Sequence, residues 1–270
     1  MQIEALGIIA GSKSLPLVVA REARAQGIKK IVAVAFTNET SAEIESLADQ
    51  THWIKVGQLS KLIDSFKKSG VRHCVMAGQV APKNLFDVRP DLRGLGLLLR
   101  LKEKNARTVF GAIANELKKE GVELIDATPW LQSEMPAKGF HLGPKLTNEQ
   151  REDIAFGVRL AKELSKMEIG QTVVVKEGTV LAVEAFEGTD ACLSRGGALA
   201  GKDGGAVAVK VARDDHDMRF DIPCIGALTV QACGESGVAV LAIEGGKTLV
   251  LEREAVEGLV KKHKISLVAT

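Results

Sequence analysis

The sequence predicts an α/β fold, because strand-length apolar segments alternate with helical segments through the first half of the chain. Five such segments lie at residues 3–9, 31–36, 53–56, 72–77 and 122–126. Each is predominantly apolar, as expected of strands that are buried on both faces of a parallel sheet. Helical patterns fill the intervening residues, so we predict a doubly wound, Rossmann-like parallel sheet.

The second half of the chain predicts a further α/β domain with a mixed sheet. Length alone favours two domains, because 270 residues exceed the usual size of one. Thr147-Asn-Glu-Gln150 has the pattern of a capping box that opens a helix, and Glu177-Gly178 separates two strand patterns as in a hairpin. We therefore expect a first domain, a linker and a second domain at residues 1–130, 131–146 and 147–270.

The distribution of glycine and leucine predicts a long helical region, a break within it and a mobile loop. We expect a long helical region over 92–120 with a break near Gly111, and a mobile loop over 196–205, where half of the residues are glycine. The helical region is rich in large apolar side chains, for which a buried core is the ordinary explanation and an apolar groove or a surface that meets lipid is the alternative. These side chains are Leu95, Leu97, Leu98, Leu99, Leu101, Val109 and Phe110.

Composition excludes several classes of protein. The net charge is only +2, and aromatic residues make up 4% with no Tyr, so neither a nucleic-acid groove nor a base-stacking platform is indicated. Four cysteines lack a C-x-x-C pair and predict free thiols in a reducing compartment. Without a signal-peptide pattern or a membrane-spanning apolar run, we expect a cytoplasmic protein, with contact to a membrane surface left open.

Two glycine-bearing loops follow predicted strands of the first domain. Gly11, Ser12 and Lys13 come after the first strand, and Gly78 and Gln79 begin a second loop after the fourth. Ligands of doubly wound sheets bind at the carboxyl ends of strands, where glycine permits close approach and helix N-termini attract phosphate. Neither loop has a G-x-G-x-x-G or Walker pattern, so we predict a nucleotide-type ligand without a nicotinamide or ATP signature.

A charged segment near the C-terminal end predicts a second candidate site. As a strand, residues 217–223 would place Met218, Phe220 and Ile222 on one face and the polar set on the other. That polar set is Asp217, Arg219 and Asp221. Two carboxylates beside a guanidinium suit a cation or a phosphate, whereas the alternative is an edge strand with solvated ion pairs.

Four ordered motifs together resemble one family. They are Gly7-Ile-Ile-Ala-Gly11-x-x-x-Leu-Pro16, Met76-Ala-Gly78-x-Val80, Leu181-Ala-Val-Glu184-Ala-x-Glu187-Gly-Thr-Asp190 and Asp217-x-Arg219-x-Asp221-x-Pro223-x-Ile-Gly226. The chain resembles the LpxI-type UDP-2,3-diacylglucosamine pyrophosphatases of lipid A biosynthesis along essentially its whole length. Two departures from the family pattern are Lys13, where a further glycine is common, and His216, which we do not assign as a ligand.

The resemblance implies a reaction, a cofactor and an assembly. Family members hydrolyse UDP-2,3-diacylglucosamine to UMP and 2,3-diacylglucosamine 1-phosphate with a divalent cation such as Mg²⁺. They bind the nucleotide in the N-terminal domain, use a C-terminal catalytic and lipid-sugar-binding domain, and form homodimers. Their essential aspartate lies in the D-x-R-x-D-x-P region, which places it at Asp221, with Asp217 as the alternative.

These implications assign roles to individual residues. The expected Mg²⁺ ligands are Asp221, Asp217, Glu187 and Asp190, because Mg²⁺ prefers carboxylate, phosphate and water oxygens. Arg219 either clamps a phosphate or holds the aspartates in an ion pair. The expected substrate-binding residues are Gly11, Ser12, Lys13, Gly78, Gln79, Gly188 and Thr189, the last also a helix N-cap. Lys176 and Lys210 could contact phosphate, but we expect them to be solvated.

Other functions remain as alternatives at this point. A non-catalytic nucleotide-sugar or lipid-binding protein could use the same α/β scaffold, as could another UDP-sugar enzyme such as a transferase. The carboxylate row favours hydrolysis, because a cation facing the ligand offers a binding protein no advantage. Scattered histidines, a missing zinc pattern and the absence of G-x-S-x-G disfavour a zinc enzyme or an acyl hydrolase.

Overall fold

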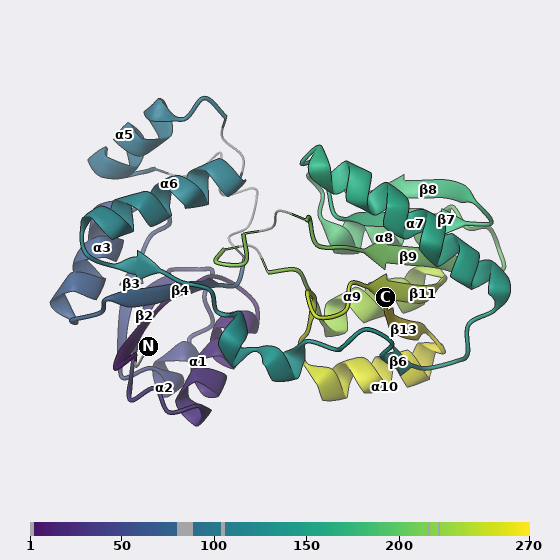
Figure 1. Ribbon diagram of the computed structural model, residues 1–270, viewed down its shortest axis with the longest axis horizontal. Helices are drawn as coiled ribbons and strands as arrows, with labels where there is room; N and C mark the ends of the chain where they lie inside the picture. The colour runs from purple at the N-terminus through teal and green to yellow at the C-terminus, as the bar shows by residue number, and fades with distance from the viewer. Residues whose placement is uncertain (1–2, 80–88, 104–105, 215–216, 221) are drawn as a thin grey trace. The chain divides into compact units, whose positions relative to one another are not determined.

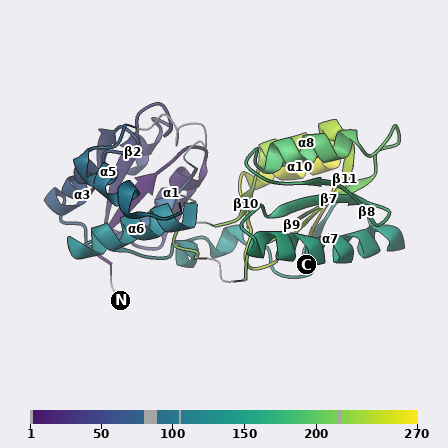
Figure 2. The same cartoon turned by 90° about the horizontal axis from the view of Figure 1, so that it is seen from above.

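The computed structural model describes two compact α/β units (Figures 1 and 2). The described residues are 3–79, 89–103, 106–214, 217–220 and 222–270. The first unit comprises residues 1–131 together with 217–221, and the second comprises 132–216 and 222–270. The chain therefore returns to the first unit for one short segment, the charged segment singled out in the sequence.

The first unit is built on a five-stranded parallel sheet, which confirms the predicted class. Its strands are β1 (Ala5–Ala10), β2 (Lys30–Phe36), β3 (Gln50–Ile54), β4 (His73–Ala77) and β5 (Glu123–Leu124). Their order is β3-β2-β1-β4-β5, and every neighbouring pair is parallel. The order reverses beside β1, so the carboxyl ends of β1 and β4 form the switch point at which ligands of such sheets bind.

Helices cover both faces of this sheet (Figure 1). They are α1 (Leu15–Ala25), α2 (Ile44–Leu47), α3 (Leu59–Lys68), α5 (Leu92–Arg100) and α6 (Ala106–Lys119). Phe66 of α3, Leu97 of α5 and Leu117 of α6 share one buried cluster with strand residues. The predicted break near Gly111 is wrong, because α5 ends at Arg100 and Gly111 lies inside α6.

The second unit contains a six-stranded mixed sheet in the order β6-β13-β11-β9-β7-β8. The strands are β6 (His141–Leu142), β7 (Thr172–Lys176), β8 (Thr179–Val183), β9 (Ala206–Lys210), β11 (Val238–Ile243) and β13 (Ser266–Ala269). β9, β11 and β13 are parallel, whereas β6, β7 and β8 pair antiparallel with their neighbours. The mixed sheet predicted for this half is confirmed. β10 (Cys224–Ile225) and β12 (Leu249–Val250) form a separate parallel pair.

Helices cover both faces of the mixed sheet. They are α7 (Asn148–Lys166) on the first face, and α8 (Thr189–Ala198), α9 (Ala227–Ser236) and α10 (Arg253–His263) on the second. Figure 2 shows α7 on the opposite side from α8 and α10. The 3₁₀ turns Thr128–Trp130 and Gln132–Glu134 lead from one unit to the next. Gly196 and Gly197 lie buried within α8, so the loop predicted over 196–205 begins only after Ala198.

The capping box and the hairpin that the sequence predicts for the second unit are both confirmed. Thr147 Oγ1 accepts a hydrogen bond from Gln150 N at 3.2 Å, and Gln150 Oε1 accepts one from Thr147 N at 3.0 Å. This reciprocal capping box opens α7. Glu177 and Gly178 both have positive φ and join β7 to β8, as a tight hairpin requires. No helix among the described residues is long and apolar enough to cross a membrane.

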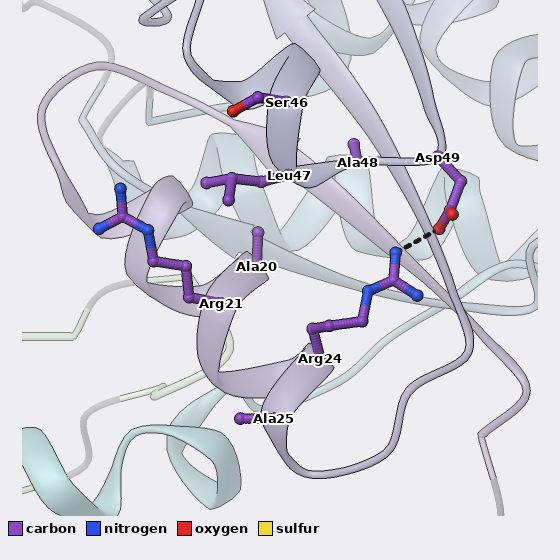
Figure 3. Close-up of a pocket in the computed structure, with 8 residues that line it drawn as sticks. All are labelled: Ala20, Arg21, Arg24, Ala25, Ser46, Leu47, Ala48 and Asp49. Carbon is purple, nitrogen blue, oxygen red and sulfur yellow. Dashed lines mark hydrogen bonds and ion pairs between the residues drawn. The ribbon is translucent and has the colours of Figure 1, made fainter.

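A pocket between α1 and α2 is lined by two arginines, each of which forms an ion pair (Figure 3). Arg24 pairs with Asp49 at 2.6 Å, and Arg21 pairs with Glu43. Asp49 also accepts a hydrogen bond from Ile31 N at 2.7 Å. That backbone donor is the main reason that the pKa of Asp49 lies below its usual value; partial burial opposes the shift and Arg24 adds to it.

The lowered pKa of Asp49 predicts a pH-dependent contribution to stability. Because the folded state holds this carboxyl ionised more strongly, its contribution is present above the unfolded pKa and is lost as pH falls through the folded pKa. Asp49→Asn is expected to lower the free energy of unfolding at neutral pH by about 1 kcal/mol. The value is small because solvent screens the ion pair of a partly exposed carboxylate. Urea unfolding at a series of pH values should show the difference from wild type shrinking below about pH 4. A difference that is constant with pH would contradict this prediction.

Candidate functional site

The two glycine loops of the first unit lie against each other, as the sequence predicts. Ser12 N donates to Gln79 O at 2.8 Å, Gln79 N donates to Ser12 O at 3.4 Å, and Ser12 Oγ donates to Gln79 O at 2.5 Å. Gly11 N also donates to Ala77 O at 2.8 Å. The sheet places these loops together because β1 and β4, which they follow, are neighbours.

The paired loops are tight because two glycines have no side chain. A Cβ on Gly11 would lie 2.8 Å from Gly78 C, and a Cβ on Gly78 would lie 2.5 Å from Ser12 O. Gly78 also has a φ of +85°, which favours glycine. Lys13 is exposed beside the loops, with no described partner for its ammonium group. A cation and the start of α1 at one edge of the sheet are suited to a phosphate-bearing ligand.

The charged segment is a turn rather than a strand. Residues 218–220 form the turn, and Phe220 N donates to Asp217 O at 3.3 Å. The predicted strand is wrong, because alternation fixes only the two faces of a segment and the described residues here pair with no neighbouring strand. Phe220 instead packs into the core of the first unit, with its ring centroid 6.0 Å from that of Phe110.

Within this turn, Asp217 and Arg219 form a two-pronged ion pair. Arg219 Nε and Nη2 donate to the two carboxylate oxygens of Asp217 at 2.8 and 2.6 Å. The Arg219 guanidinium lowers the pKa of Asp217 against the opposing effect of burial, and Asp217 raises the pKa of Arg219 in turn. The pair is therefore ionised at neutral pH. Asp221, His216 and residues 80–84 of the second loop lie outside the described residues.

The second unit contains a buried polar chain that the sequence analysis did not anticipate. Lys210, at the end of β9, donates to Thr189 Oγ1 at 2.6 Å, and Thr189 Oγ1 donates to Glu184 Oε1 at 2.7 Å. The exposed fractions of Lys210 and Glu184 are only 8% and 9%. The expectation of a solvated Lys210 is wrong, because α8 and the preceding loop cover the end of β9. Lys176 is likewise engaged, donating to Ala200 O at 2.8 Å.

The Glu187–Asp190 loop divides its side chains between different partners. Glu187 pairs with Arg195 at 2.5 Å, and this hydrogen bond is the main cause of its lowered pKa. Asp190 Oδ1 accepts a hydrogen bond from Thr229 at 2.9 Å, and no described residue bonds to its other carboxylate oxygen. Gly188, with a φ of +84°, occupies the N-cap position that was expected for Thr189, which instead begins α8.

The hydroxyl of Thr189 bridges two buried charged groups, so its loss should destabilise the second unit. Thr189→Val keeps the shape of the side chain but removes the hydrogen bond that the Lys210 ammonium group donates, and it leaves Glu184 with the described hydrogen bond from Gln171 N at 3.2 Å. We expect the free energy of unfolding to fall by about 2 kcal/mol, measured by urea denaturation. Thr189→Ser, which retains the hydroxyl, is the matched control and should lose less. Equal stability of wild type and Thr189→Val would contradict the bridge.

The described carboxylates have oxygen atoms of the kind that bind Mg²⁺, but they differ in how many of these atoms are already paired. Mg²⁺ binds to one or two carboxylates and completes its shell with water and phosphate. Asp190 has an oxygen free of described hydrogen bonds, whereas Asp217 and Glu187 are paired with arginine. The described residues contain no group of three or more His, Cys, Asp or Glu side chains arranged for a metal. The donor chemistry thus fits a cation that takes few protein ligands.

One of the four free cysteines, Cys192, lies near the buried polar chain. Cys74, Cys192 and Cys233 are buried free thiols, and Cys224 is partly buried. Burial, with a smaller effect from Glu184, raises the pKa of Cys192 to about 12. This thiol beside the polar chain therefore stays protonated and is a poor nucleophile at neutral pH.

The first unit has tight paired loops at the switch point of its sheet, and the second has a buried Lys–Thr–Glu chain. Together they define a two-domain α/β protein, whose paired loops suit an anionic ligand. Models of the LpxI N-terminal domain and the LpxI C-terminal domain match residues 5–133 and 137–268. The UDP-2,3-diacylglucosamine pyrophosphatase LpxI of Caulobacter vibrioides is 31% identical over 262 residues, covering 93% of this chain and 92% of that protein. The chain belongs to the LpxI family.

Similarity to solved structures is much weaker. The biotin carboxylase domain of a thermophilic 2-oxoglutarate carboxylase bound to ADP is 13% identical, with 64% of this chain and 35% of that chain covered and a TM-score of 0.30. The dimer of this domain from Hydrogenobacter thermophilus is 14% identical, with 76% and 43% covered and a TM-score of 0.31. The chain spans less than half the length of either, and neither informs its function.

Proposed function

We propose that the protein hydrolyses the pyrophosphate bond of UDP-2,3-diacylglucosamine, releasing UMP and 2,3-diacylglucosamine 1-phosphate. The supporting observation is the similarity to the Caulobacter vibrioides pyrophosphatase, which extends over both units at 31% identity. The Asp217-x-Arg219-x-Asp221-x-Pro223 motif lies within the matched C-terminal domain.

The reaction adds water to one phosphorus and breaks its bond to the bridging oxygen, which leaves on the other phosphate. Non-bridging oxygens carry negative charge throughout, so catalysis needs fixed positive groups and an oriented water. In the first unit, Lys13 and the loops at Gly11, Ser12, Gly78 and Gln79 are proposed to hold the UDP moiety. In the second, Gly188 and Thr189 are proposed to contact the sugar phosphate.

The buried chain supports a positioning role for Lys210. Its ammonium group donates a hydrogen bond to Thr189 Oγ1, while the Thr189 hydroxyl donates one to Glu184. This fixes the side chain at the first residue of α8, where backbone N–H groups favour an anion. Asp221 is proposed as the catalytic carboxylate, and Arg219 as the group that either clamps phosphate or holds Asp217 in its ion pair.

We propose Mg²⁺ as the cofactor, with Asp221 and Asp190 as the first ligands to test and Asp217 and Glu187 as further candidates. When bound, the cation would neutralise charge on the pyrophosphate oxygens. Asp190 is favoured among the described residues because its second carboxylate oxygen has no hydrogen-bond partner there. Asp217 and Glu187 would first have to exchange an arginine for the cation.

The deciding experiment measures UMP release from UDP-2,3-diacylglucosamine by the purified protein with Mg²⁺. Release above a protein-free control is expected, and its absence at every divalent cation tried would contradict the hydrolase. Binding of the substrate without release would instead favour a binding protein. If UMP release is undiminished after EDTA removes divalent cations, the proposed Mg²⁺ cofactor is contradicted but the hydrolase activity is not. Sedimentation tests the proposed homodimer, and cell fractionation tests the proposed cytoplasmic location.

A further inference from the structure

A stripe of exposed leucines runs along α5 of the first unit. The exposed fractions of Leu92, Leu95 and Leu99 are 91%, 44% and 73%. At 3.6 residues per turn, positions 92, 95 and 99 lie within about 60° of arc on the helix. The three side chains therefore form one apolar surface, which we call the leucine stripe. A soluble protein seldom leaves such a contiguous apolar surface unless it meets a partner.

Residues on the other side of α5 pack against the first unit, in which Figure 1 shows the helix. Leu97 is buried in the core cluster, and α5 packs against α3 and α6. Asp91 caps the helix, accepting from Gly94 N and Ser60 N, both at 2.8 Å. Arg93 pairs with Glu116 at 2.8 Å. With its inner face held by packing and by these polar contacts, α5 presents the leucine stripe outward as a fixed feature.

Basic side chains flank the leucine stripe at both ends. Arg89 precedes the helix, and Arg100 and Lys102 lie at and beyond its end; all three are exposed. No ion pair or hydrogen bond to another described residue engages any of their charged groups. Each cation is therefore available to a negatively charged partner beside the stripe.

We infer that the leucine stripe and its three flanking cations dock the protein onto a bilayer surface containing anionic phospholipid. Leucine side chains can enter the boundary between headgroups and acyl chains while neighbouring cations stay among the phosphates, as in interfacial amphipathic helices. The short α5 lies on the surface and does not span it. Docking through this surface requires neither the proposed active-site residues nor turnover.

A second copy of this chain is the less suitable occupant. If the leucine stripe covered itself in a two-fold contact, Arg89, Arg100 and Lys102 of each copy would approach the same cations of the other. Such an interface would gather six cations, and the exposed Glu103 that follows Lys102 in each copy would offset only part of this charge. An anionic lipid surface instead neutralises all three at once.

Vesicle binding by the intact protein without substrate tests the inference. We expect co-sedimentation with phosphatidylglycerol–phosphatidylcholine vesicles, weakened by salt, and little with phosphatidylcholine alone. The double substitution Leu92→Glu/Leu99→Glu should weaken binding about tenfold or more, as should Arg100→Gln/Lys102→Gln. Met167→Glu, an exposed apolar residue of the second unit, is the matched control and should bind as wild type does.

Several results would overturn the inference. These are no vesicle binding by the wild type, equal binding to phosphatidylcholine alone, or wild-type binding by the leucine double variant. Circular dichroism and a thermal melt establish that this variant is folded, which its exposed positions favour. Analytical sedimentation of the same variant tests self-association. If the variant changes from a dimer to a monomer while its vesicle binding is unchanged, the leucine stripe is a contact between two copies of the chain. Failure of the hydrolase assay leaves this test unaffected.

Discussion

Asp221→Asn is expected to reduce UMP release by about 10³-fold or more, because it removes a carboxylate charge while nearly preserving side-chain shape. The assignment rests on the motif Asp217-x-Arg219-x-Asp221 and on membership of the LpxI family. In its proposed role, this carboxylate helps to hold the cation and to orient the attacking water, so its loss should slow the reaction. The measurement is the steady-state rate of UMP release, with circular dichroism to establish that the variant folds.

Two further aspartates make the experiment specific. Asp64→Asn introduces the same change on the exposed side of α3 and should leave the rate unchanged. Asp217→Asn should have a smaller effect than Asp221→Asn, because the Asp217 carboxylate is already committed to Arg219. If Asp217→Asn abolishes release while Asp221→Asn keeps the wild-type rate, the catalytic role belongs to Asp217.

The parallel sheet and its paired loops could be predicted because the determining signals are local. Apolar runs such as Ile31–Phe36 are buried on both faces, and this pattern leaves few alternatives to a parallel sheet. Once β1 and β4 are neighbours, the loops at Gly11 and Gly78 must meet at their carboxyl ends. The contact between the loops could be predicted although Ser12 and Gln79 are 67 positions apart, because the strand order brings them together.

The conformation of residues 217–220 and the burial of Lys210 depend on interactions that the sequence pattern does not encode. Alternating polar and apolar residues suit a strand, but Asp217 and Arg219 pair equally well across a turn. Lys210 ends a strand whose residues are all buried, Ala-Val-Ala-Val-Lys, and this was the available signal. Its burial depends on α8 covering the strand end and on the Thr189 hydroxyl, neither of which follows from local periodicity.

Gly78→Ala is expected to be the most destabilising of the substitutions considered, with a loss of about 3–4 kcal/mol. Two separate costs combine at this position. Its φ of +85° disfavours any side chain, and the added Cβ would lie 2.5 Å from Ser12 O and 2.9 Å from Pro16 Cγ. The backbone of one loop would have to move away from the other, which would also spread the edge proposed to hold UDP.

Two other glycines of the first unit separate these costs. Gly27 has a φ of +95° and nothing within 4 Å of an added Cβ, so Gly27→Ala should lose only about 1 kcal/mol. Gly11 lacks a positive φ, but its Cβ would lie 2.8 Å from Gly78 C, so Gly11→Ala reports the clash alone. Urea denaturation should rank Gly78→Ala as the least stable variant and Gly27→Ala as the most stable. If Gly78→Ala and Gly27→Ala lose the same amount, the loops separate freely and their tight contact contributes nothing to the stability of the unit.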